Sequence, residues 1–99
     1  MEIVKTQNEK ATTLGLTGRL DTITSPKLQE ALTEVIPLSE AIELDFTGVE
    51  YVSSAGLRVL LFGQKNMQSA GKTMKLTNVS SEVMEVFEVT GFSGMLTIE

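Results

Sequence analysis

Two adjacent serines, Ser53 and Ser54, stand between a β-like stretch and a strongly apolar run, in the sequence "VEYVSSAGLRVLLF". Serine is a preferred residue at the N-cap of a helix, so one of these hydroxyls can be structural. The other would be available to a modifying enzyme or a binding partner. A helix N-terminus also tolerates phosphate, because its unpaired N–H groups and the helix dipole favour negative charge. The pair therefore poses two alternatives, a cap and a phosphorylation site.

The residues after the serines predict an unusual helix. Ala55 and Gly56 are too small to shield Ser54, and Arg58 is the only charged residue in the first two turns. Its apolar residues form two stripes, and a helix with two apolar faces packs either on two elements of its own domain or on one element and a partner. The first stripe would face the sheet, and the second would pack on a neighbouring helix or contact another protein. The two stripes are Leu57, Leu60 and Leu61, and Ala55, Val59 and Phe62.

The composition excludes several kinds of chemistry. The 99 residues include no cysteine and no histidine, from which we exclude disulfides, thiolate chemistry, zinc sites and imidazole catalysis. The net charge of −5 argues against nucleic acid and against an anionic membrane surface as partners. No run approaches the roughly 18 apolar residues of a membrane span, and the start "MEIVKTQNEK" lacks a signal-peptide pattern. We expect a cytoplasmic binding protein, not an enzyme, without cofactor or metal.

Strand-like and helix-like segments alternate along the whole chain, in the order β-β-α-β-α-β-α-β. Serine or proline precedes the helical runs, and glycine or proline follows them, as is typical of helix ends. The predicted elements are two strands within 2–18 joined by a turn near residues 8–10, a helix capped by Ser25 that ends before Pro37, a strand over 41–46, a helix over 54–69, a strand over 73–78, a helix capped by Ser80 or Ser81 and closed by Gly91, and an edge strand over 95–99.

This order predicts a single α/β domain over residues 1–99, with a small mixed, mostly parallel sheet. Alternating strands and helices favour parallel strands joined by right-handed crossovers. Strands covered on both faces read as continuous apolar runs, whereas Glu43, Asp45 and Lys75 occupy alternate strand positions here. We therefore expect the helices mainly on one face of the sheet.

Two motifs, "TGRLD" at residues 17–21 and "VSSAGLRVLL" at 52–61, resemble the STAS domain, and specifically the bacterial anti-sigma factor antagonists. The resemblance covers nearly the whole chain. It implies that Ser54 is the phosphate acceptor, in preference to Ser53, which stands where the family usually has an acid. It also implies a partner-binding surface made of Asp21, Ser53, Ser54, Gly56, Leu57 and Arg58.

The same resemblance implies a mechanism of partner switching. The unmodified domain docks on a kinase-type anti-sigma factor, which then releases its sigma factor. The kinase phosphorylates Ser54 and thereby ends the docking, and a separate phosphatase reverses the modification. No nucleic acid, membrane or cofactor takes part.

Two alternatives remain open on the sequence. The first is a STAS scaffold or accessory subunit, for example of a transport ATPase, that is never phosphorylated, because a fold does not dictate function. The second is a receiver-type phosphoacceptor at Asp45, although alternation with Leu44 and Phe46 predicts an ordinary solvated strand residue there.

Overall fold

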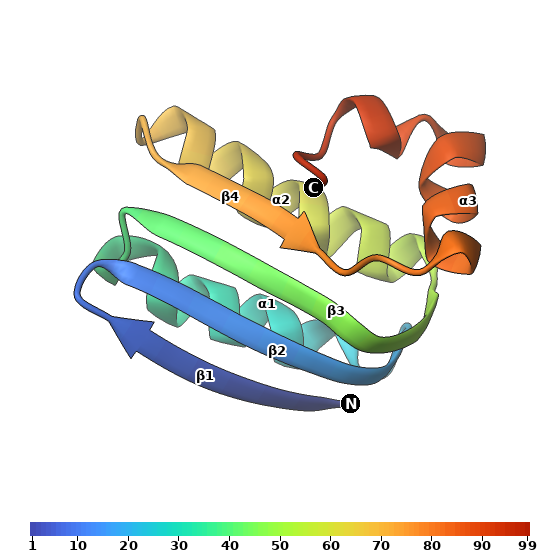
Figure 1. The fold of residues 1–99 in the computed structure, drawn as a ribbon, viewed down its shortest axis with the longest axis horizontal. Coiled ribbons are helices and arrows are strands. Elements are labelled where there is room, and N and C mark those ends of the chain that lie inside the picture. The colour runs from blue at the N-terminus through green and yellow to red at the C-terminus, as the bar shows by residue number, and fades with distance from the viewer.

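The computed structural model describes all 99 residues, from Met1 to Glu99. A four-stranded sheet has the order β1-β2-β3-β4, with β1 antiparallel to β2 and the other neighbours parallel (Figure 1). The strands are β1 (Glu2–Asn8), β2 (Ala11–Leu20), β3 (Ala41–Val52) and β4 (Thr73–Thr77), and the helices are α1 (Ser25–Val35), α2 (Ser54–Ser69) and α3 (Ser81–Thr90), with short 3-10 turns η1 (Ile36–Leu38) and η2 (Phe92–Gly94). The predicted fold class is confirmed.

The two parallel strand pairs are covered by helices on one face. Side chains of β2 and β3 alternate between buried and half-buried, with Leu14, Leu44 and Phe46 in the core and Glu43 and Asp45 on the open face. Figure 1 shows α1 and α2 side by side behind the sheet, while α3 lies at one end, beyond β4. The polar alternation therefore marked the uncovered face correctly.

The second apolar stripe of α2 faces the neighbouring helix. Helices α1 and α2 pack against each other, Val59 is buried, and Ala55 and Phe62 are half-buried. A side chain added at Gly63 would come within 3.1 Å of Leu32 on α1, so the two helices approach closely. Of the two alternatives for this stripe, the structure shows the packing of helix on helix.

Strand β3 is longer than the predicted segment 41–46 and continues to Val52. Two register shifts in the β2–β3 ladder accompany the extension, between Gly15 and Thr17 and between Gly18 and Arg19. Such irregularities let two strands stay paired while they bend and twist. As a result both strands end together, with Leu20 opposite Val52, immediately before the serine pair.

Helix α1 begins one residue earlier than predicted. Thr24 takes the N-cap position, and Ser25 is the first helical residue, with its hydroxyl donating to the carbonyl oxygen of Asp21. Helix α2 spans Ser54–Ser69 as predicted. Ser80 caps α3, and the helix ends before Gly91, which has a left-handed backbone with φ 81°.

The predicted edge strand over 95–99 is reduced to a single parallel bridge between Leu76 and Ile98. The N–H of Leu76 donates to Thr97 O at 2.8 Å, and the N–H of Glu99 donates to Leu76 O at 2.9 Å. The N–H of Thr97 donates to Oε1 of the buried Gln64, and Nε2 of the same side chain donates to the Thr97 hydroxyl oxygen. The side chain of Gln64 on α2 therefore helps to hold this segment beside β4.

Candidate functional site

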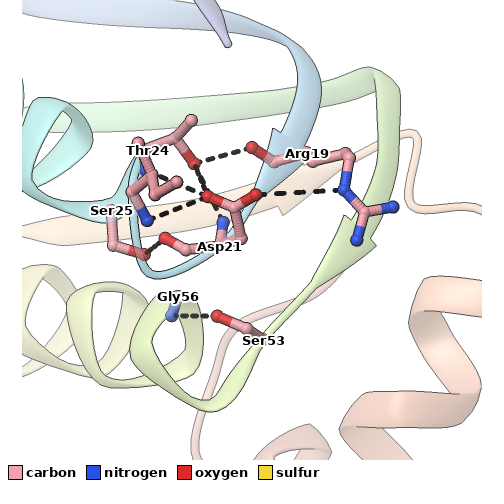
Figure 2. A network of polar contacts seen from close by, with 7 residues as sticks. Arg19, Asp21, Thr24, Ser25, Ser53 and Gly56 are labelled. Carbon is pink, nitrogen blue, oxygen red and sulfur yellow. Dashed lines mark hydrogen bonds and ion pairs between the residues drawn. The ribbon is translucent and has the colours of Figure 1, made fainter.

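The two serines at the start of α2 have different environments. Ser53 is the N-cap residue, with φ −92° and ψ 175°, and its hydroxyl oxygen accepts the N–H of Gly56 at 3.3 Å (Figure 2). Ser54 is the first helical residue, is exposed, and its hydroxyl makes no hydrogen bond within the chain. The structural role thus falls to Ser53, and the hydroxyl of Ser54 is open to other molecules.

The main-chain amides around Ser54 are only partly used. The N–H of Ser53 donates to Leu20 O at 2.8 Å, which ties the start of α2 to the end of β2, and the N–H of Leu57 donates to Ser53 O at 2.9 Å. The N–H groups of Ser54 and Ala55 have no acceptor in the chain. These two donors, together with the positive end of the dipole of a 16-residue helix, favour a negative group at Ser54.

Gly56 and Leu57 set the position of the helix start. Both are buried. A Cβ atom on Gly56 would lie 2.7 Å from Leu20 Cγ and 2.9 Å from Leu20 O, so only glycine lets α2 begin directly against β2. Leu57 belongs to the core cluster. Their contribution to the site is to hold Ser54 at the surface, and contact with a partner stays a prediction for both residues.

Asp21 organises the loop between β2 and α1, which lies beside the start of α2 (Figure 2). Its Oδ1 accepts the N–H groups of Ile23 and Thr24, both at 3.0 Å, and the Thr24 hydroxyl lies 3.1 Å from the same oxygen. The N–H of Thr24 contributes most to lowering the pKa of Asp21, and its hydroxyl, the N–H of Ile23 and the charge of Arg19 add to it, against an opposing effect of partial burial. The carboxylate is therefore ionised and holds its own loop.

Sequence reasoning did not identify the partners of the Arg19 side chain. The guanidinium lies 4.2 Å from the centroid of the Tyr51 ring, and Arg19 Nε lies 3.9 Å from Asp21 Oδ2. A cation above an aromatic face is stabilising, by about 0.5–1 kcal/mol at exposed sites. The register that brings Arg19 opposite Tyr51 follows from the bulge beside it, which no local pattern predicts.

Arg58 borders a groove between α1 and α2. It is exposed and has no acidic group within ion-pair distance. The groove has a volume of about 760 Å³. Its lining includes Thr22, which follows Asp21 in the chain, and Ala55, which follows Ser54. The α1 side carries Glu30 and Glu34, which are both exposed. Ser54, Arg58 and the Asp21 loop therefore lie around one end of this groove.

Asp45 lies away from the serines, half-buried on the open face of the sheet. Its Oδ1 accepts hydrogen bonds from the N–H and hydroxyl of Thr47, at 3.0 and 2.6 Å, and from the Asn78 amide at 3.0 Å. These contacts, the Thr47 hydroxyl above all, lower the pKa of Asp45. The carboxylate joins β3 to the segment after β4, and no group of three acids is placed to hold a metal ion.

The fold and the exposed serine define a small α/β domain with a hydroxyl available at the end where β2, β3 and α2 meet. Residues 3–97 match the family model described as "Mlab, STAS domain", and the chain belongs to the STAS domain family. No helix in the structure is both long and apolar enough to traverse a membrane.

Relatives and solved structures agree with this family. The chain is 36% identical over 84 residues to a protein named anti-sigma-B factor antagonist from Listeria monocytogenes, a match that covers 83% of this chain and 73% of the relative. The fold is similar to the unphosphorylated anti-sigma factor antagonist SpoIIAA, with a TM-score of 0.84, 17% identity, and coverage of 99% of this chain and 88% of that one. The phosphorylated form of the Bacillus cell fate determinant SpoIIAA aligns with a TM-score of 0.78, 16% identity, and coverage of 99% and 91%.

Proposed function

We propose that this protein is an anti-sigma factor antagonist of the cytoplasm that docks on a kinase-type anti-sigma factor and is switched off by phosphorylation of Ser54. The names of its relatives support the class of partner. The observation that carries the proposal is the exposed Ser54 hydroxyl, free of hydrogen bonds, one residue after the serine that caps α2. A separate phosphatase restores the docking form.

The surroundings of Ser54 suit a phosphoserine. The N–H groups of Ser54 and Ala55 are unused, and they lie at the positive end of α2. Arg58, one turn further on, has no acidic partner and can pair with the phosphate. The domain therefore accommodates the modification without unfolding, while a surface docked on Ser54 meets roughly two negative charges and added bulk.

The choice of Ser54 over Ser53 follows from the cap. The Ser53 hydroxyl is half-buried and accepts the N–H of Gly56, so phosphorylating it would disrupt the first turn of α2. Ser54 has neither constraint. In this proposal the partner surface comprises Asp21, Ser53, Ser54, Gly56, Leu57 and Arg58, with the buried members acting through the placement of α2.

The experiment is an incubation of the purified domain with ATP and the kinase-type anti-sigma factor of the same organism, read by intact mass and peptide mapping. One phosphate on Ser54 is expected in the wild type and in Ser53→Ala, and none in Ser54→Ala. Ser54→Asp should bind the partner more weakly than wild type, and its free energy of unfolding should change by less than about 1 kcal/mol.

Two results would contradict the proposal. Phosphate on Ser53 alone would contradict the assignment of the acceptor. A stable complex with another protein, without phosphate on Ser54 under any condition with ATP, would favour the alternative of a STAS scaffold or accessory subunit, for example of a transport ATPase.

A further inference from the structure

Ile23 lies in the loop between β2 and α1 and is 87% exposed, more than any other large apolar side chain of the chain. A single exposed apolar residue is common in soluble proteins, so exposure alone carries no argument. What distinguishes Ile23 is the rigidity of the loop that presents it and the surface that this loop adjoins.

The loop is held by hydrogen bonds on both sides of Ile23. The carboxylate of Asp21 accepts the N–H groups of Ile23 and Thr24 at 3.0 Å each, and the N–H of Asp21 donates to the Thr24 hydroxyl oxygen at 2.9 Å. That hydroxyl donates in turn to Arg19 O at 2.7 Å. The backbone at Ile23 is therefore ordered before any partner binds, and a contact made by its side chain costs less conformational entropy than one made by a mobile loop.

The loop adjoins the surface around Ser54. Thr22, next to Ile23 in the chain, lines the same groove of about 760 Å³ as Ala55, which follows Ser54. The bond from the N–H of Ser53 to Leu20 O joins the two segments directly. A protein that covers Ser54 therefore meets the loop as well.

The charges beside the loop indicate the chemistry of the partner. Glu30 and Glu34 on the α1 side of the groove are exposed and form no ion pair, and the whole chain has a net charge of −5. A partner that lies along this groove gains complementarity when it presents Lys or Arg to α1.

We propose that Ile23 is the apolar anchor of the docking surface: it inserts into a concave apolar pocket on the anti-sigma factor, whose basic rim faces Glu30 and Glu34. This inference rests on the function proposed above. Asp21 is then a positioning residue, because its carboxylate fixes the backbone that presents Ile23. Interface anchors of this kind are a few well-placed side chains that supply most of the binding energy.

The test compares Ile23→Ala and Ile23→Thr with Leu38→Ala, a matched control that is 64% exposed and follows the other end of α1. The probe is the purified kinase-type anti-sigma factor, with affinity measured by calorimetry and Ser54 phosphorylation followed in parallel. Ile23→Ala should weaken binding by about 10- to 30-fold, Ile23→Thr by less, and Leu38→Ala by less than twofold. The kinase should show a raised KM for Ile23→Ala with kcat unchanged.

A double-mutant cycle tests the role of Asp21. In the wild-type background, Asp21→Ala should weaken binding to the anti-sigma factor several-fold. In the Ile23→Ala background it should cause little further loss of affinity, because the loop then has no anchor to position. Additive effects of the two substitutions would overturn the positioning role. Thermal melts of Ile23→Ala and Leu38→Ala should coincide with the wild type, since both side chains are exposed.

The outcomes separate the two proposals. If wild type and Ile23→Ala have equal affinity and equal KM, and both carry phosphate on Ser54, the role of Ile23 as an anchor is overturned and the proposed function stands. Weakened binding by Ile23→Ala with no phosphate on Ser54 would support the anchor and contradict the phosphorylation switch. A wild-type domain that binds no anti-sigma factor would overturn both.

Discussion

Substitution of Gly56 by alanine tests how the start of α2 is positioned. The added Cβ would lie 2.7 Å from Leu20 Cγ and 2.9 Å from Leu20 O. The side chain of Leu20 has little room to move, because it is fully buried. The carbonyl oxygen is held as well, since it accepts the N–H of Ser53 at 2.8 Å. The first turn of α2 must therefore shift away from β2.

The magnitude follows from opposing effects. Alanine is favoured over glycine inside a helix by about 1 kcal/mol. Overpacking of a close contact costs about 1–3 kcal/mol, and a weakened cap at Ser53 costs up to about 1 kcal/mol more. We expect Gly56→Ala to lower the free energy of unfolding by about 1–2 kcal/mol, although helix propensity alone predicts the opposite sign.

Urea unfolding at neutral pH measures this difference, with two glycine controls. Around Gly94 no atom lies within 4 Å of an added Cβ, so Gly94→Ala should change stability by less than about 0.5 kcal/mol. At Gly63 an added Cβ meets only the ends of side chains, Met74 Sδ at 2.9 Å and Leu32 Cδ1 at 3.1 Å, and no backbone atom, so Gly63→Ala should lower stability less than Gly56→Ala does. If the Gly56→Ala variant has the same free energy of unfolding as the wild type, or as the Gly63→Ala variant, the close contact between α2 and β2 is refuted.

Three further predictions follow from other contacts. Ser53→Ala should lower stability by about 1 kcal/mol, because it removes the cap of α2, and Ser54→Ala by less than about 0.5 kcal/mol in the same urea titrations. The Thr47 hydroxyl and further hydrogen bonds hold the folded pKa of Asp45 below its ordinary 3.8, so its contribution to stability is complete above that pH and is lost as pH falls through the folded value. Unfolding curves from pH 2 to 6 should therefore show a shallower acid dependence for Asp45→Asn. Gln64→Leu should lower stability by about 1–2 kcal/mol, because it leaves a main-chain N–H of the C-terminal segment unpaired, and amide hydrogen exchange of that segment should accelerate.

The sequence predicted well those features that depend on residues close together in the chain. Helix α2 begins and ends where the helix over 54–69 was predicted, and α3 follows its serine cap. The open face of the sheet was correctly inferred from the polar positions at Glu43, Asp45 and Lys75. Each of these signals is a local period or a local hydrogen bond, which a chain carries whatever its distant segments do.

The parts that sequence patterns missed involve contacts between distant segments. The strand predicted over 41–46 and the β-like stretch before Ser53 form one continuous strand, β3, whose pairing with β2 contains two register shifts that the sequence did not predict. The C-terminal segment forms one bridge instead of a strand, and the N–H of Thr97 donates to the side chain of Gln64, 33 positions earlier in the chain. The sequence also gave no sign that Ile23 would be held rigid and exposed, because that required the partners of Asp21.

The sequence by itself determined that this is a small α/β domain with two serine hydroxyls at the N-terminus of an apolar helix. The alternation of polar and apolar residues, the helical period and the capping residues that showed this are all local properties of the chain. The tertiary structure alone decided which serine is free. Ser53 is held by Leu20 O through its N–H, and Gly56 lets α2 start flush against β2, so Ser53 faces inward as the cap and Ser54 faces solvent. That choice depends on the close packing of two segments more than thirty residues apart, and such packing exists only in the folded chain.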